Sequence, residues 1–208
     1  MYRLPFIASI IFACGLVFYF LVLRGTPITH DSWTGPVDSC AYIGIEPDEP
    51  EWPTMLTSAH CGVIDSHGVL HVDKDLLKKI SFEPSMPSCL LSRGRSFYVD
   101  RSGRTNEVYF FDMGCDYFSE GLARSPSPQG TRFIDSSLQV VISTPYQFSQ
   151  PFDGEVAVVC DELRHRKELF DEHDKYVGGQ CGYIDRKGLL IVPMRYSIDE
   201  VDKHRPGV

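Results

Sequence analysis

One motif that recurs four times limits what this chain can fold into more than any other feature. It places an aromatic or β-branched pair before an aspartate, in "CGVIDSHG" at 61–68, "SFYVDRSG" at 96–103, "TRFIDSSL" at 131–138 and "QCGYIDRKG" at 180–188. The aspartates, Asp65, Asp100, Asp135 and Asp185, are 35, 35 and 50 residues apart, and a charged insertion at 161–176 accounts for the longer interval. Self-similarity at such a period is typical of proteins that stack small structural units.

A second marker keeps the same register. Phe82, Phe118 and Phe152 follow their respective aspartates by 17, 18 and 17 residues. The two markers together divide the region into repeats at about 58–92, 93–127, 128–160 and 178–208.

The motif predicts β-hairpins. Aspartate at the first position of a type I turn can accept a hydrogen bond from the backbone two residues on, and Gly68, Gly103 and Gly188 at the fourth position can take the left-handed conformation that lets the next strand pair back. The third repeat has Leu138 there, which costs about 1 kcal/mol if the same backbone is kept, so its turn can differ. Strand-like runs flank the turns, and we therefore expect an all-β domain at 54–208 built from about four β-hairpin repeats.

The fourth copy, "CGYIDRKGLLIVPMRY" at 181–196, resembles the bacterial WG repeat. That family has Trp-Gly-aromatic-Ile-Asp-x-x-Gly, then an apolar strand ending in Pro and a nearby aromatic residue, and later Phe-x-Glu-Gly-x-Ala. The matching residues are Gly182, Tyr183, Ile184, Asp185, Gly188, Pro193 and Tyr196, and "FSEGLA" at 118–123 and "FDGEVAVV" at 152–159 match the closing element. The Trp that names the repeat is replaced by Cys61 and Cys181, so the copies are degenerate.

The resemblance implies an array of β-hairpin units in an exported or cell-surface bacterial protein, with no shared catalytic chemistry. We therefore favour a non-catalytic binding or scaffold protein that recognises a protein or a cell-envelope polymer, and we expect no catalytic residue, cofactor or metal. The alternative is an exported hydrolase.

The stretch "LTSAHCG" at 56–62 supports that alternative, because it is similar to the sequence around the catalytic histidine of trypsin-like serine proteases. In the repeat alignment, however, His60 takes the position of Gln180. The sequence has no Gly-Asp-Ser-Gly-Gly stretch, and "DKDLLKKI" begins only 13 residues after His60. A base without a nucleophile and an oxyanion hole performs no acyl transfer, so we assign His60 to the repeat.

Residues 4–23 carry no charge and are long enough for a transmembrane helix, which needs about 20 residues. A cleaved signal peptide or a lipoprotein signal at Cys14 are the alternatives, but bulky Phe18, Tyr19 and Phe20 stand where a cleavage site requires small residues. We favour a signal anchor with a cytoplasmic tip at 1–3 that includes Arg3. A Pro-rich acidic tether at 24–53 then leads to the domain, which lies outside the inner membrane, in the periplasm.

Net charge restricts the partners of the exported part. Residues 25–208 contain 18 Lys and Arg against 28 Asp and Glu. This balance argues against nucleic acid or anionic lipid as a partner. It leaves a protein or an envelope polymer as the expected ligand, with a single membrane anchor.

Six cysteines lie in the exported part: Cys40, Cys61, Cys89, Cys115, Cys160 and Cys181. An even number in an oxidising compartment indicates up to three disulfides, and six cysteines allow 15 connectivities. We favour the sequential pairs 40–61, 89–115 and 160–181. The rival is a Cys61–Cys181 bond, which would require the array to close on itself.

The remaining polar clusters have simpler interpretations. We expect the insertion at 161–176 to form a short surface helix that begins at Asp161 and sets Leu163, Leu169 and Phe170 against the sheet. We expect the carboxylates of Glu120, Asp153 and Glu155 in solvated turns, and His67 and His71 on the surface.

Overall fold

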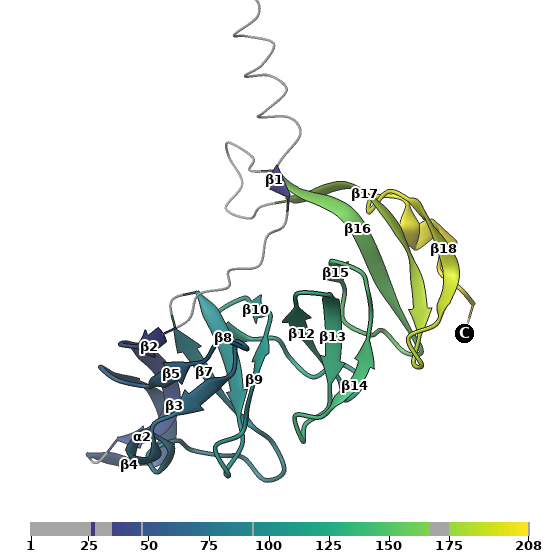
Figure 1. The fold of residues 1–208 in the computed structure, drawn as a ribbon. Coiled ribbons are helices and arrows are strands. Elements are labelled where there is room, and N and C mark those ends of the chain that lie inside the picture. Colours follow the sequence, from purple (N-terminus) through teal and green to yellow (C-terminus); the bar gives the residue numbers. More distant parts are fainter. Residues whose placement is uncertain (1–25, 28–34, 47, 93, 167–174, 208) are drawn as a thin grey trace, which may run out of the picture.

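The computed structural model describes residues 26–27, 35–46, 48–92, 94–166 and 175–207 (Figure 1). These residues form an all-β structure of small antiparallel sheets, and the only α-helix among them is the four-residue α2 (Lys74–Leu77). The sheets follow one another along a curved row, from β2 and β4 at one end to β18 at the other (Figure 1).

A three-stranded antiparallel sheet recurs in this row, and each copy contains one of the predicted turns. We number the copies units one to four. Unit one is β2 (Gly35–Val37), β5 (Gly62–Ile64) and β6 (Leu70–Val72), and unit two is β7 (Ser88–Ser92), β8 (Arg95–Val99) and β9 (Thr105–Val108). Unit three is β12 (Ala123–Ser127), β13 (Gly130–Ile134) and β14 (Val140–Ser143), and unit four is β16 (Val156–Arg166), β17 (Lys175–Asp185) and β18 (Leu190–Tyr196).

Other elements extend these sheets. The hairpin of β3 (Cys40–Glu46) and β4 (Glu49–Ser58) joins unit two, because β3 pairs with β7. Strands β1 (Thr26–Pro27) and β15 (Phe148–Ser149) both pair with β16 of unit four. A small hairpin of β10 (Phe110–Phe111) and β11 (Gly114–Cys115) follows unit two, and a 3-10 helix, η1 (Val201–His204), follows unit four.

Each unit has one strand more than the predicted hairpin, and this additional strand comes first in the sequence. Strands β7 and β12 lie in sequence within the preceding predicted repeat, but each pairs with the second strand of its own unit. The motif marks only the turn between the last two strands, so it carries no signal for the strand that precedes them. The units therefore begin earlier in the chain than the predicted repeat boundaries.

The hydrophobic cores lie between successive units, because alternate residues of a strand point to opposite faces of its sheet. In β8, Phe97 and Val99 face the core shared with unit one, and Tyr98 faces the core shared with unit three. In β13, Ile134 faces the unit-two side and Phe133 faces unit four. The internal sheets thus bury both faces. The outer face of unit four is covered by η1, whose Val201 is fully buried there.

Part of the predicted tether is folded. The tether was assigned to 24–53, but residues from 35 onward form β2, β3 and the first half of β4. Its prolines suggested an irregular chain, yet Pro36 lies in β2 and Pro53 lies in β4, both of which are edge strands. An edge strand tolerates proline because one side of its backbone needs no ladder hydrogen bond.

The helix predicted for the insertion is wrong where the structure describes it. Residues 161–166 continue β16 and residues 175–176 begin β17, and the ladder runs from the Asp161↔Gln180 pair to the Arg166↔Lys175 pair. Cross-strand pairing that starts at the paired cysteines outweighs the helical pattern of this charged segment. Leu163 does contact the core of unit four, as expected, but from a strand. Leu169 and Phe170 lie outside the described residues.

The predicted signal anchor at 4–23, the tip at 1–3 and Cys14 also lie outside the described residues. Within the part of the chain that is described, none of the helices has the length and apolar character needed to span a bilayer.

Candidate functional site

The four repeated aspartates form the same turn in every unit. Each aspartate accepts a hydrogen bond at its carbonyl from the residue three positions on, and its N–H donates to the carbonyl four positions on. Its Oδ1 accepts from the N–H of the residue four positions on, at 2.9–3.0 Å in all four turns. In units one, two and four Oδ1 also accepts from the N–H two positions on, as predicted, at 2.8–2.9 Å. These carboxylates hold the backbone and are spread over four separate sheets, so they do not form one site.

The third turn keeps this backbone despite having leucine instead of glycine. Leu138 adopts φ 57°, next to values of 79°, 87° and 78° at Gly68, Gly103 and Gly188. Its side chain is 5% exposed and packs in the core between units two and three. The left-handed conformation is therefore retained where the side chain gains burial.

Neighbouring units are linked by a contact that was not predicted from the sequence. The arginine that follows the turn aspartate covers a closing phenylalanine: the guanidinium carbon of Arg101 lies 5.0 Å from the centre of the Phe82 ring, and that of Arg186 lies 5.2 Å from the Phe152 ring. Arg101 also donates to the Phe82 carbonyl at 2.9 Å. The sequence signal for this contact was an arginine directly after two of the four turn aspartates, together with the repeated closing phenylalanine. These contacts add to the packing between units one and two and between units three and four.

Two buried ion pairs were also missed, because their residues have no motif. Asp116 is fully buried and accepts from the Arg124 guanidinium and from the Arg124 N–H, at 2.5–3.2 Å. Arg95 and Glu107 form a second pair across β8 and β9, with a closest distance of 2.6 Å. Each arginine also lies over an aromatic ring. Each of these four buried charged groups is paired inside the sheets, and we therefore interpret all four as structural.

The three sequential disulfides are formed. The bonded pairs are Cys40–Cys61, Cys89–Cys115 and Cys160–Cys181, with Cα atoms 6.0, 5.8 and 4.1 Å apart. The rival Cys61–Cys181 bond is excluded, because both residues have other partners. Three disulfides are typical of a domain that folds in an oxidising compartment, outside the cytoplasm.

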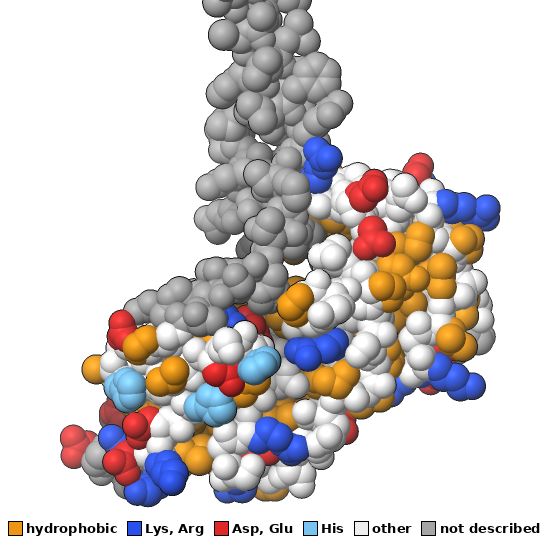
Figure 2. Space-filling view, in the orientation of Figure 1, with side chains coloured by type: hydrophobic (Ala, Val, Ile, Leu, Met, Phe, Trp, Pro, Cys, Tyr) orange, Lys and Arg blue, Asp and Glu red, His pale blue; other side chains and the backbone are white. Residues whose placement is uncertain are grey.

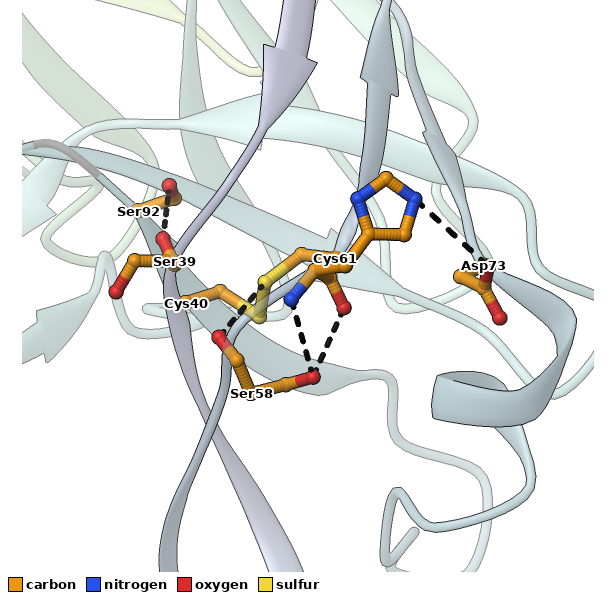
Figure 3. Close-up of a disulfide and its surroundings, with 7 residues drawn as sticks. Ser39, Cys40, Ser58, Cys61, Asp73 and Ser92 are labelled. Atoms are coloured by element: carbon orange, nitrogen blue, oxygen red, sulfur yellow. Dashed lines mark hydrogen bonds and ion pairs between the residues drawn. A yellow bond between two sulfur atoms is a disulfide. The ribbon is translucent and has the colours of Figure 1, made fainter.

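The surroundings of His60 provide the test of the hydrolase alternative (Figure 3). The ring Nε2 of His60 lies 3.8 Å from Asp73 Oδ2, so the fold brings together two residues whose spacing had seemed unsuitable. The Ser58 hydroxyl, however, donates to the His60 carbonyl at 2.8 Å and accepts from its N–H, so it bonds the backbone of His60. Asp73 caps α2 by accepting from the Asp75 N–H. Cys61 is in a disulfide.

These contacts do not provide a nucleophile–base pair. A nucleophilic hydroxyl or thiol has to reach the ring nitrogen of the base, and among the described residues no such group hydrogen-bonds the His60 ring. His60 is also exposed, at the edge of unit one. The geometry is that of a surface histidine beside a helix cap.

A histidine-rich surface surrounds this point on unit one. Figure 2 shows histidine and acidic side chains gathered over the end of the molecule that carries β2 and β5. His71 Nε2 lies 2.8 Å from Asp65 Oδ2, and this hydrogen bond is the main reason why the pKa of Asp65 falls to about 2. His67 Nδ1 is 4.0 Å from the same carboxylate. Within the described residues, no group of three or more His, Cys, Asp or Glu side chains is placed to hold a metal ion.

The other carboxylates near glycine also have structural contacts. Glu120 has φ 51° in a tight turn that joins Ser119 to Leu122, and its carbonyl accepts from Arg186 of unit four. Asp153 begins a similar turn and pairs with Arg205. Glu155 lies in that turn, before β16.

The strongest candidate for a binding surface is apolar. Val140 and Val141 of β14 are 44% and 53% exposed, and the run that begins β18 is equally open, with Leu189 61%, Leu190 42% and Ile191 45% exposed. The turn that leads into β18 lies against β14, since a Cβ at Gly188 would lie 2.8 Å from Ile142 of β14. We call these five residues the apolar edge. Both strands are sheet edges, so they also offer unpaired backbone groups.

Comparison of the chain with models of protein families, with curated proteins and with solved structures gives no match.

Proposed function

We propose that this protein is a non-catalytic binding or scaffold module held outside the cytoplasmic membrane. Its four units are degenerate WG-like repeats, its anchor is the apolar segment 4–23, and its ligand is a protein or a cell-envelope polymer that contacts the apolar edge. The observation that carries this proposal is the apolar edge itself, five exposed apolar residues on or beside two edge strands.

The burial pattern supports a binding role for these residues. Exposed apolar residues that cluster on a surface mark sites where another molecule binds, whereas single ones are common and need no explanation. In unit one, the residue that corresponds to Leu190 is Leu70, and it is 1% exposed because unit two covers it. In unit four the same strand position is open. An extended protein segment could pair with β18 and set its side chains on Leu190.

The chemistry of the turns is consistent with a scaffold. The repeated aspartates are engaged by backbone N–H groups in all four units, and the arginine–phenylalanine contacts join units one to two and three to four. The repeated residues therefore build the array, and the surface residues can differ from unit to unit. The three disulfides agree with export.

The test is a capture experiment with the full chain in detergent against a membrane and envelope extract. Leu189→Glu should abolish capture of the ligand, because it places a charge in the apolar edge. Val69→Glu is the matched control, since Val69 holds the same position in unit one and is 42% exposed. Equal capture by both variants, or loss of capture in the control alone, would rule out the apolar edge as the binding surface.

A further inference from the structure

We infer that the far part of the β16–β17 hairpin lies at the bilayer surface, so that unit four, the last in sequence, is the membrane-proximal end of the array. We call this part the distal hairpin; its described residues are 163–166 and 175–178. The inference rests on the proposed anchor at 4–23.

The start of the exported chain is attached to the distal hairpin. Strand β1 pairs with β16, with Thr26 opposite His165 and Pro27 opposite Arg164. Only Arg24 and Gly25 separate the apolar segment from this pairing. An extended chain spans at most about 3.6 Å per residue, so the Cα of Thr26 lies within about 11 Å of that of Leu23.

This short link limits how far the distal hairpin can lie from the membrane. Paired strands are about 4.8 Å apart, which places the backbone of β16 at His165 within about 16 Å of the last apolar residue. The headgroup layer on each side of a bilayer is about 5–7 Å thick. If residues 4–23 cross the membrane, the distal hairpin therefore lies in or just above the headgroup layer.

A bend fixes the direction of the distal hairpin relative to unit four. Between the Cys160–Cys181 bond and the pairing with β1, Glu162, Gly178 and Gly179 all have positive φ, at 57°, 72° and 77°. A Cβ at Gly179 would lie 2.8 Å from Leu163 Cδ2, so the two strands are tightly packed at the bend. Figure 1 shows β16 and β17 curving over toward β1. Attachment at β1 consequently orients the whole unit.

This arrangement reverses the order expected from the sequence. Unit one follows the anchor in the chain and would be expected nearest the membrane. In Figure 1, β1 lies beside β16 and β17, whereas β2 and β5 of unit one lie toward the opposite end of the row. The histidine-rich surface of unit one is therefore the membrane-distal end.

The side chains of the distal hairpin suit an interface without requiring anionic lipid. It carries Arg164, Lys175 and Tyr176, the last with its ring 4.7 Å from that of Phe148, and basic and aromatic residues are typical of the headgroup level. The exported part as a whole has 18 Lys and Arg against 28 Asp and Glu, which does not favour anionic lipid. We therefore expect the contact to follow from attachment and to persist in neutral lipid.

The test uses the full chain with Cys14→Ser, reconstituted in phosphatidylcholine vesicles that contain a headgroup spin-labelled lipid. A fluorophore is attached through Lys175→Cys or, as the control, through His67→Cys; both native side chains are exposed. Lipid quenching should be several-fold stronger at position 175. Equal or stronger quenching at position 67, in protein that resists carbonate extraction, would overturn the inference and leave the anchor intact. Release by carbonate would overturn both.

A cross-link tests the attachment itself. Thr26→Cys with His165→Cys should form a disulfide in the vesicle-bound chain, because opposed residues of an antiparallel pair have Cα atoms about 4.5–5.5 Å apart, within the range of a disulfide. Thr26→Cys with His67→Cys should not. Failure of the first pair to cross-link, or equal cross-linking of both, would refute the inference.

Discussion

Leu138 offers a sharp test of the turn geometry, because it reverses a common order of stability. Alanine is more stable than glycine at most positions, since glycine loses more conformational freedom on folding, by about 0.5–1 kcal/mol. At Leu138 the backbone has φ 57°, where any side chain is strained. We predict that Leu138→Gly is more stable than Leu138→Ala.

The size of the effect follows from the contacts of the residue. Leu138 is 5% exposed, so both variants lose a buried side chain, at about 2–5 kcal/mol each. Alanine keeps the strain of the left-handed conformation, about 1–2 kcal/mol, and glycine removes it. The relief exceeds the entropy that glycine loses, so glycine should be ahead by about 0.5–1 kcal/mol.

Urea unfolding followed by circular dichroism measures both variants against the parent chain. Ser137, the preceding residue, is the control: it is outside the set of residues with positive φ, so Ser137→Ala should be more stable than Ser137→Gly. If Leu138→Ala equals or exceeds Leu138→Gly in free energy of unfolding, the third turn does not share the backbone of the other three.

Three further predictions concern units one and four. Gly68→Ala should cost about 1–2 kcal/mol from backbone strain alone, and Gly188→Ala should cost more in the same urea assay, because its Cβ would lie 2.8 Å from a methyl group of unit three, whereas the nearest atom at Gly68 is 4.0 Å away. The pKa of Asp65 is lowered to about 2 by the bond from His71, so its contribution to stability is present above pH 3.8 and is lost as the pH falls toward 2; Asp65→Asn should remove that part of the acid dependence of unfolding. His60→Ala should change the free energy of unfolding by no more than about 1 kcal/mol and leave ligand capture intact, and loss of a hydrolytic activity in this variant would restore the hydrolase alternative.

What the sequence predicted correctly is local chemistry. An aspartate three residues before glycine, between apolar runs, is enough to specify a turn, and the structure has this turn at Asp65, Asp100 and Asp185. The sequential disulfide pairing, favoured among the 15 possible connectivities, is the one formed. The charged insertion was misassigned, because pairing across Cys160 and Cys181 decides its conformation and a helical pattern alone cannot show that pairing.

The candidate site was less predictable than the fold. Exposure of the apolar edge depends on which neighbouring unit covers a strand, and the sequence pattern is the same whether that strand is covered or open. Leu70 and Leu190 occupy equivalent positions, but only Leu70 is buried. The arginine–phenylalanine contacts were hard to predict for the same reason, because Arg101 and Phe82 come together only when two units are stacked.

The position four residues before each turn aspartate accounts for two of the cysteines, Cys61 and Cys181. It holds Cys61, Ser96, Thr131 and Cys181, and all four are fully buried. In units two and three, two residues join the first strand to the second, so pairing of those strands is local. In units one and four the same connection is interrupted by the β3–β4 hairpin and by the distal hairpin.

A long connection raises the entropy cost of pairing its ends, and a disulfide reduces that cost in the unfolded chain. The two long connections are the ones that have cysteine at this position, bonded to Cys40 and to Cys160. The cysteines at this position thus occur where a unit has to tolerate an insertion. The insertion bridged by Cys160 and Cys181 is also the one to which β1 attaches, so this bond secures the part of the array that we place nearest the membrane.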